Sequence, residues 1–233
     1  MVDDSNTREK GIPHNPEVRD LIAGKRRYTA SQEEQKADAS LGFDGWSERG
    51  YLPHRDEPGL VQFVTFHLHD SLPVALRSEW EALLKIEDVE IRRRKLEAYL
   101  DKGRGSSYLR RPEIATIVDT ALRYYHNRSF DLRAWVVMPN HVHALFKVRE
   151  CPMRQSLRSF KIYTARECNK LLGRRGEFWA DDLWDTFMRD AEHELRTKRY
   201  IENNPVKAKL SVFAKDWPWA SARFRDEYGR LKF

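Results

Sequence analysis

The sequence predicts an α+β fold in which helices cover an antiparallel sheet. Runs rich in β-branched and aromatic residues at 60–68, 132–138 and 183–188 are typical of strands. Amphipathic helical patterns separate the first and last of these runs from the middle one. The breaker Pro139-Asn140 follows the middle run directly, and a further apolar run comes after it, so we expect a hairpin there.

Four segments show helical periodicity. Residues 112–126 carry apolar side chains at the spacing of one helix face, and Pro112 suits a first helical position. The other helices are expected at 74–101, 154–172 and 192–204. On the helix at 154–172 the predicted inward residues are Leu157, Phe160 or Lys161, Thr164, Cys168 and Leu171. In the strand at 132–138, Trp135 and Val137 should face one side of the sheet, and Ala134, Val136 and Met138 the other.

Length and composition suit one globular domain with additions. The chain has 233 residues, of which 40% are hydrophobic and 33% charged. No apolar run approaches the roughly 18 residues that span a bilayer, and the first residues lack the apolar region of a signal peptide. We therefore expect a cytoplasmic protein without a membrane partner. Cys151 and Cys168 lack a CxxC spacing, so we expect both to be reduced.

We divide the chain into an N-terminal extension at 1–49, a domain at 50–222 and a C-terminal tail at 223–233. The extension has few large apolar residues and is expected to be flexible. Its cationic cluster is Lys25-Arg26-Arg27-Tyr28. The whole chain has 42 Lys plus Arg against 36 Asp plus Glu, a formal charge of +6. That balance permits nucleic-acid binding without establishing it.

The first candidate site is the histidine pair His141 and His143, which follows the hairpin turn. Alternate side chains of a strand share a face, so both imidazoles can bind one divalent ion. Paired histidines also occur as ordinary surface residues, and the spacing alone does not decide between these readings. A second pair, His67 and His69, has the same spacing but runs off a strand end, so we expect it to consist of surface or strand-end histidines.

The second candidate site is the pair Tyr200 and Asn204. Residues four apart share one face of a helix, so a phenol and an amide oxygen are presented together. We expect Pro205 to end this helix, because proline cannot continue the hydrogen-bond ladder. Asn204 can supply an oxygen ligand beside the two imidazoles. Such a mixed donor set suits manganese or another borderline ion, whereas magnesium prefers ligands that are all oxygen.

Several motifs in a fixed order carry a family resemblance. MPNHVH is followed by RYIENNPVKA and then by DWPWASA, and GWSERGYLPHRDEPGLVQFVTFHL precedes them. Over about 45–222 the chain resembles the REP-associated tyrosine transposases, a branch of the HUH single-tyrosine transposases. The resemblance implies a ferredoxin-like sheet and metal-dependent cleavage and transfer of single-stranded DNA at repetitive extragenic palindrome hairpins. It implies Tyr200 as the nucleophile that takes a 5′-phosphate, and an ion, Mg²⁺ or Mn²⁺, held by His141, His143 and Asn204.

Competing assignments stay open at this point. Tyr163 is the alternative nucleophile, although only Tyr200 has an oxygen ligand one helical turn away. The whole chain could instead be a DNA-binding protein without cleavage activity. A small-molecule metallohydrolase would need a carboxylate base, for which Asp190 and Glu202 are the candidates. A homodimer is carried as an alternative to a monomer.

Cations for DNA contact gather on and after the helix at 154–172. They are Arg154, Arg158, Lys161, Lys170, Arg174 and Arg175. Phe178, Trp179 and Trp184 follow and could add base stacking to phosphate contacts. The alternative is that the cations form a solvated face and the aromatic residues belong to the core.

Overall fold

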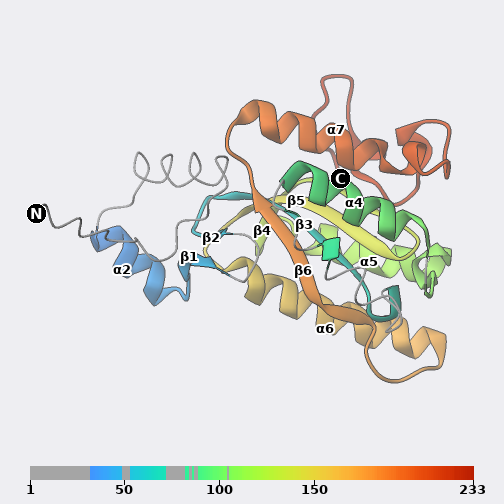
Figure 1. Ribbon diagram of the computed structural model, residues 1–233, viewed down its shortest axis with the longest axis horizontal. Helices are drawn as coiled ribbons and strands as arrows, with labels where there is room; N and C mark the ends of the chain where they lie inside the picture. The colour runs from blue at the N-terminus through green and yellow to red at the C-terminus, as the bar shows by residue number, and fades with distance from the viewer. Residues whose placement is uncertain (1–31, 49–52, 72–81, 84–85, 87–88, 104) are drawn as a thin grey trace, which may run out of the picture.

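An antiparallel four-stranded sheet is the centre of the structure, a computed structural model that describes residues 32–48, 53–71, 82–83, 86, 89–103 and 105–233 (Figure 1). Its strand order is β4-β5-β3-β6. The four strands are β3 (Val61–Leu68), β4 (Phe130–Val137), β5 (His141–Val148) and β6 (Trp179–Phe187). Residues 1–31, with the predicted cationic cluster at 25–28, lie outside the described part of the chain.

Helices connect these strands in the ferredoxin-like manner. Between β3 and β4 run α4 (Val89–Asp101) and α5 (Pro112–Tyr125), the hairpin joins β4 to β5, and α6 (Met153–Leu172) leads to β6. Helix α7 (Ala191–Lys207) follows the last strand. Short 3₁₀ turns are His69–Ser71, Tyr108–Arg110, Ala214–Asp216 and Ser221–Phe224. The order of elements and the sheet topology confirm the predicted α+β fold with a ferredoxin-like antiparallel sheet.

A helix and a strand occupy part of the predicted N-terminal extension. Helix α2 (Gln32–Ser40) precedes β1 (Gly45–Glu48), which pairs with β2 (Pro53–Asp56) in a separate two-stranded sheet. Phe43, between α2 and β1, is buried in the main core. The packing of Phe43 attaches this segment to the domain, which the polar composition of the segment did not indicate.

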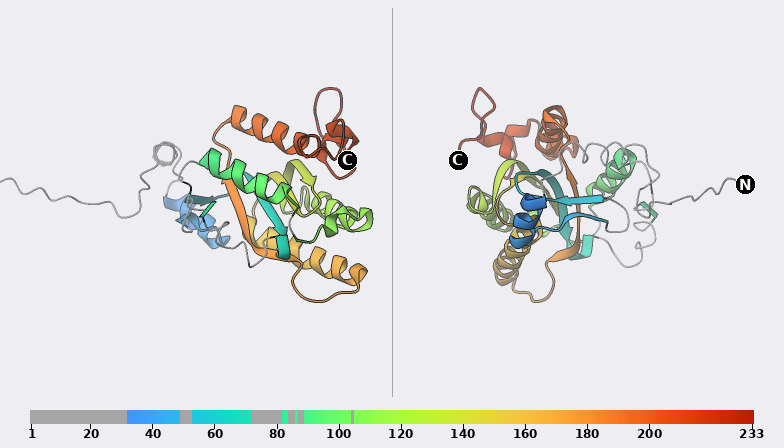
Figure 2. Two further views of the ribbon diagram at one scale, coloured as in Figure 1. Left: turned by 45° about the vertical axis from the view of Figure 1, so that its right-hand side comes forward. Right: turned by 90° about the vertical axis from the view of Figure 1, so that its left-hand side faces the viewer.

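The two faces of the main sheet have different cores. One core joins Trp135 and Val137 of β4 to α5 and to Leu157 and Phe160 of α6. The other joins Ala134, Val136 and Met138 of β4 to Phe63, Leu145 and Ile201, the last from α7. The predicted faces of β4 are therefore confirmed. Both turned views place α6 and α7 on opposite sides of the sheet (Figure 2).

Three details differ from the sequence predictions. Leu171, predicted to face inward on α6, is 47% exposed because it lies in the last turn, beyond the sheet-covering part of the helix. Strand β6 begins at Trp179 rather than at Leu183. Helix α7 continues past Pro205 to Lys207. The proline removes one N–H donor, but the next turn is still closed, because the amide of Ala208 donates to the carbonyl of Asn204 at 2.9 Å.

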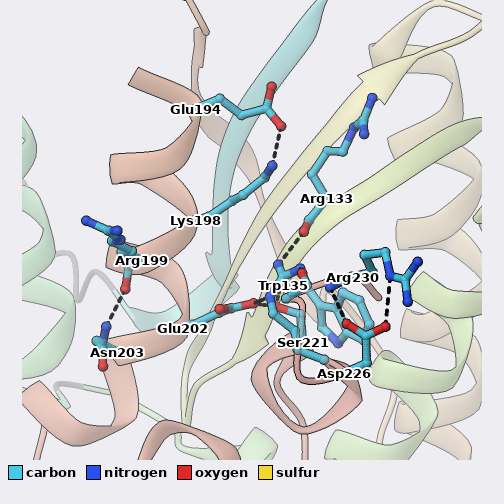
Figure 3. Close-up of polar contacts among 12 residues, drawn as sticks. Arg133, Trp135, Glu194, Lys198, Arg199, Glu202, Asn203, Ser221, Asp226 and Arg230 are labelled. Carbon is cyan, nitrogen blue, oxygen red and sulfur yellow. Dashed lines mark hydrogen bonds and ion pairs between the residues drawn. The ribbon is translucent and has the colours of Figure 1, made fainter. Parts of the chain in front are cut away.

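Polar contacts anchor α7 to the edge of β4 (Figure 3). The Glu202 carboxylate accepts hydrogen bonds at 2.6 Å from Ser221 Oγ and from Arg225 Nε. Ser221 Oγ accepts one from the Trp135 amide, and Arg225 donates to the Arg133 carbonyl at 2.7 Å. The network thus joins the helix, the strand and the C-terminal segment.

The aromatic segment after α7 also packs back on the sheet, as predicted. The Val137 amide donates to the Trp219 carbonyl, and Trp217 Nε1 donates to the Val137 carbonyl, both at 2.9 Å. Together with the Glu202 network, these bonds determine where α7 lies over the sheet.

The Glu202 network yields a stability prediction. Glu202→Ala leaves the buried Ser221 hydroxyl and the half-buried Arg225 guanidinium without their acceptor, so the free energy of unfolding should fall by about 1.5–3 kcal/mol. Glu192→Ala on the same helix is the control, because the ion pair of Glu192 with Arg196 is exposed and is expected to contribute at most about 0.5 kcal/mol. Urea denaturation measures both. Equal midpoints for the two variants would refute the anchoring role.

Candidate active site

His141 and His143 lie on the face of β5 that α7 covers. Val142 and Ala144 belong to the core under α5 and α6, whereas Leu145, in the same row as the histidines, belongs to the core under α7. Both imidazoles are almost fully buried, with 1% and 0% exposure. The strand's period of two therefore directs the pair toward one helix.

Helix α7 brings Tyr200 and Asn204 to these histidines. Tyr200 Oη lies 3.4 Å from His143 Nε2, and Asn204 Nδ2 donates a hydrogen bond to Tyr200 Oη at 2.9 Å. The phenol ring packs edge-on against Phe63 of β3, with 6.1 Å between ring centroids. A phenol, an amide and two imidazoles from distant parts of the sequence therefore meet in one place.

A neighbouring side chain contacts the Nδ1 atom of each imidazole. His141 Nδ1 lies 2.8 Å from Asn140 Oδ1, an acceptor, so this nitrogen carries the proton and Nε2 has the lone pair. Asn140 is held in turn by its own Nδ2, which donates to the Leu100 carbonyl of α4 at 3.0 Å. His143 Nδ1 is 2.8 Å from Thr65 Oγ1. Such outer contacts orient imidazoles for a metal ion.

Two buried polar atoms in the site lack a hydrogen-bond partner among the described residues. They are His141 Nε2 and Asn204 Oδ1. Buried polar atoms are nearly always paired, so an unpaired nitrogen and oxygen in one site call for a ligand. A lone-pair nitrogen and an amide oxygen are both donors to divalent ions. Within the described ranges, no three His, Cys, Asp or Glu side chains group as a metal site.

The electrostatic surroundings keep His141 neutral. Burial, followed by the charges of His67 and Lys207, lowers the pKa of His141 to about 3. A neutral imidazole is the form that binds a metal ion. His141 is thus ready to act as a ligand at physiological pH without first losing a proton.

His67 belongs to this site, which its sequence context did not indicate. It is 4% exposed and pairs with His141 across β3 and β5. Its Nδ1 lies 2.9 Å from the Leu68 carbonyl. His69, by contrast, is at the surface, with its Nδ1 2.7 Å from Glu177. His67 is thus a strand-end histidine, as expected, next to the last residue of β3, but it is buried rather than at the surface. The pairing register is the signal that could have shown its burial.

Other predicted candidates lie away from the histidines. Tyr163 is 44% exposed on α6, which packs on the opposite face of the sheet. Asp190 caps α7 by accepting from the His193 amide at 2.7 Å, and Glu202 is engaged by Ser221 and Arg225. Neither carboxylate is placed as a base for a metallohydrolase.

The cations predicted to contact DNA are also on the α6 side. Arg154, Arg158, Lys170 and Arg175 are exposed. Lys161 instead donates to the Ala180 carbonyl at 2.8 Å, and Arg174 donates to the Glu177 carbonyl at 3.1 Å and lies over Tyr108. Of the aromatic candidates, Phe178 and Trp179 are core residues, whereas Trp184 is half-buried beside Phe63 on the α7 side.

Comparison with known proteins supports the resemblance stated above. Residues 108–204 match the family described as transposase IS200 like. That segment begins before α5 and ends at Asn204, so it contains both histidines and Tyr200. The expected resemblance to tyrosine transposases is confirmed.

A curated relative and two solved structures are also similar. The REP-associated tyrosine transposase of Escherichia coli (strain K12) is 26% identical over 100 residues, which is 43% of this chain and 59% of that protein. A structure of a REP-associated tyrosine transposase bound to a REP hairpin is 19% identical, with a TM-score of 0.46, covering 77% of this chain and 83% of its own. A putative transposase from Deinococcus radiodurans is 14% identical, with a TM-score of 0.29, covering 68% and 96%.

Two further sequence expectations concern membranes and cysteines. Among the described residues, no helix has the length and apolar character that a bilayer crossing requires. Cys151 and Cys168 are both free thiols, as predicted, and burial raises the pKa of Cys168 to about 12.

The buried His141 predicts a pH-dependent stability. Its pKa is lower in the folded state than its ordinary value of 6.5, so below that value the unfolded chain takes up the proton first and the free energy of unfolding falls. With a chelator present, the free energy of unfolding of the wild-type protein should fall between about pH 7.5 and pH 5. In His141→Gln this fall should be smaller, by on the order of 2 kcal/mol. Urea titrations at both pH values measure this. Parallel losses in both proteins would contradict it.

Proposed function

We propose that this protein cleaves single-stranded DNA and transfers the strand through a covalent tyrosine intermediate, with a divalent metal ion in the site. The observation that carries the proposal is the meeting of Tyr200 with His143 and Asn204, at 3.4 Å and 2.9 Å. The match of residues 108–204 to the transposase IS200-like family supports it. The family match covers residues 108–204, and the proposal is made for the whole chain.

In the first step the Tyr200 oxygen attacks the phosphorus of a phosphodiester. The new bond joins the phenol oxygen to the 5′-phosphate, and the bond from phosphorus to the 3′-oxygen breaks. The phenol loses its proton and the departing 3′-oxygen gains one, so the products are a 5′-phosphotyrosine and a 3′-hydroxyl. In the transfer step a 3′-hydroxyl attacks the phosphotyrosine, the phenol regains a proton, and a phosphodiester forms again. No nucleotide cofactor is needed, because the bond energy is kept in the phosphotyrosine.

His141, His143 and Asn204 are the residues that would hold the ion. The unpaired His141 Nε2 and Asn204 Oδ1 fit that role. When bound, the ion supplies charge that polarises the phosphoryl oxygens. The two nitrogens favour Mn²⁺, and we carry Mg²⁺ as the other candidate.

Asn204 has two separate duties in this proposal. Its Nδ2 donates to the Tyr200 oxygen, which orients the nucleophile and stabilises negative charge on it. Its Oδ1 points away from that bond and is left for the ion. His143 cannot act as the base for the phenol while it holds an ion, because its Nε2 has a single lone pair.

The substrate we propose is single-stranded DNA that carries a hairpin similar to a repetitive extragenic palindrome. The curated relative is named for association with REP elements, which supports this choice. The exposed cations Arg154, Arg158, Lys170 and Arg175 are candidate phosphate contacts remote from the site. The four site residues come from one chain, so a homodimer is not required to complete the site.

The covalent intermediate gives the most direct functional prediction. With Mn²⁺ and hairpin single-stranded oligonucleotides, the wild-type protein should form an adduct that survives a denaturing gel. Tyr200→Phe should abolish the adduct and leave DNA binding intact, because only the attacking oxygen is lost. Tyr163→Phe is the matched control and should retain the adduct. The reverse pattern would make Tyr163 the nucleophile, and DNA binding without any wild-type adduct would favour a binding protein.

The ligand role of Asn204 predicts a change in metal affinity. Asn204→Ala should weaken Mn²⁺ binding by at least about tenfold, since an oxygen donor is removed from the ion. Asn203→Ala is the control, because the Asn203 amide is exposed and donates only to the Arg199 carbonyl (Figure 3). Isothermal titration with Mn²⁺ measures both variants. Equal affinities would exclude Asn204 as a ligand.

A further inference from the structure

Lys207 lies beside the nucleophile but has no part in the chemistry described so far. It is the last residue of α7, seven positions after Tyr200 and three after Asn204. Side chains at these spacings follow one face of a helix, which here is the face toward the histidines. Its ammonium lies over the Tyr200 ring, with Nζ 5.7 Å from the ring centroid.

The ammonium stands at the rim of the site rather than inside it. Lys207 is exposed, whereas Asn204 and both histidines are buried. No ion pair involving Lys207 occurs among the residues that the structure describes. Its charge is therefore available to a ligand that approaches Tyr200 from solvent.

The charge of Lys207 acts on groups around the site. It contributes to the lowered pKa of His141. It also opposes the rise in pKa that partial burial causes for Asp101, at the C-terminal end of α4. Helices α4 and α7 lie on the same side of the sheet (Figures 1 and 2). Lys207 is thus a cation at the rim of the site on the α7 side, and its charge also acts on the Asp101 carboxyl.

A phosphodiester needs positive charge at this position. It carries one negative charge, and more charge accumulates on its oxygens as the phenol attacks. The side chains that surround the nucleophile are neutral: His141, Asn204 and the aromatic Phe63. A flexible ammonium beside the phenol ring can reach a phosphate whose phosphorus is in line with the phenol oxygen.

We propose that Lys207 is a further catalytic residue that binds a non-bridging oxygen of the scissile phosphodiester. The inference rests on the proposed function and adds a specific contact to it. Lys207 would contribute in two ways. It would neutralise charge that grows in the transition state, and it would place the phosphate over Tyr200.

The test compares single-turnover cleavage of one hairpin single-stranded oligonucleotide, with Mn²⁺, by the full chain and its variants. Lys207→Met should slow adduct formation by about a hundredfold, the lower end of the range for loss of one charge-stabilising donor. Lys207→Arg should recover most of the rate, since it keeps the charge. Lys198→Met is the control, because Lys198 is on the same helix but pairs with Glu194 at 2.6 Å (Figure 3).

A binding measurement separates contact with the phosphate from a structural effect. In the Tyr200→Phe background, which prevents cleavage, Lys207→Met should weaken binding of the ordinary oligonucleotide by about twofold to fivefold. It should not weaken binding of an oligonucleotide whose scissile linkage, mapped from the wild-type product, is an uncharged methylphosphonate. Equal weakening of both oligonucleotides would contradict the proposed contact.

The outcomes distinguish the two proposals. If the wild-type protein forms an adduct and Lys207→Met forms it as fast as Lys198→Met, the role of Lys207 is refuted and the proposed function stands. If the wild-type protein forms no adduct with any hairpin oligonucleotide, the proposed function fails and this inference fails with it. Thermal melting of each variant checks that the chain is folded.

Discussion

The two-residue repeat of strand β5 is the constraint on which the site depends. It directs His141 and His143 to the α7 side, while Val142 and Ala144 fill the core under α5 and α6. A slip of one residue in the pairing with β3 would exchange these sets, and buried imidazoles would enter an apolar core. The hydrophobic core therefore enforces the register that presents the histidines, so stability and site geometry have the same origin.

The second half of the site depends on the position of a helix. Tyr200 can meet His143 only if α7 lies correctly across the sheet, and helices that pack by apolar contacts alone can slide. Ile201 is buried in the core under α7, and the Glu202 network joins the helix to β4 and to the C-terminal segment. The nucleophile is thus positioned by Ile201 and Glu202, which follow it in sequence and project from other sides of the same helix.

Much of this arrangement could be predicted from the sequence because it follows from local periodicity. The faces of β4, the helix at 112–126 and the pairing of Tyr200 with Asn204 all depend on spacings of two or four residues. The burial of His67 could not be predicted in this way, since it results from the register between β3 and β5, which are far apart in sequence. The same holds for α7 beyond Pro205, where the following turn outweighs one missing hydrogen bond.

The predicted DNA-contacting cations show a further limit of sequence reasoning. Their clustering on α6 was visible in the sequence, but the face of the sheet that α6 covers depends on the chain path. That path puts α6 opposite the histidines, so Arg154 and Arg158 lie remote from Tyr200. The motif that contains Tyr200 and Asn204 gives no separate sequence signal for Lys207, although this residue lies on the same helix.

We propose that two imidazoles of β5 and the Asn204 oxygen of α7 form one ion site beside Tyr200. Anomalous diffraction from crystals grown with Mn²⁺ tests it most directly, because the signal locates the ion without assumptions about ligands. We expect one strong peak within bonding distance of His141 Nε2, His143 Nε2 and Asn204 Oδ1. A fully occupied ion elsewhere on the protein, with this cluster empty, would contradict it.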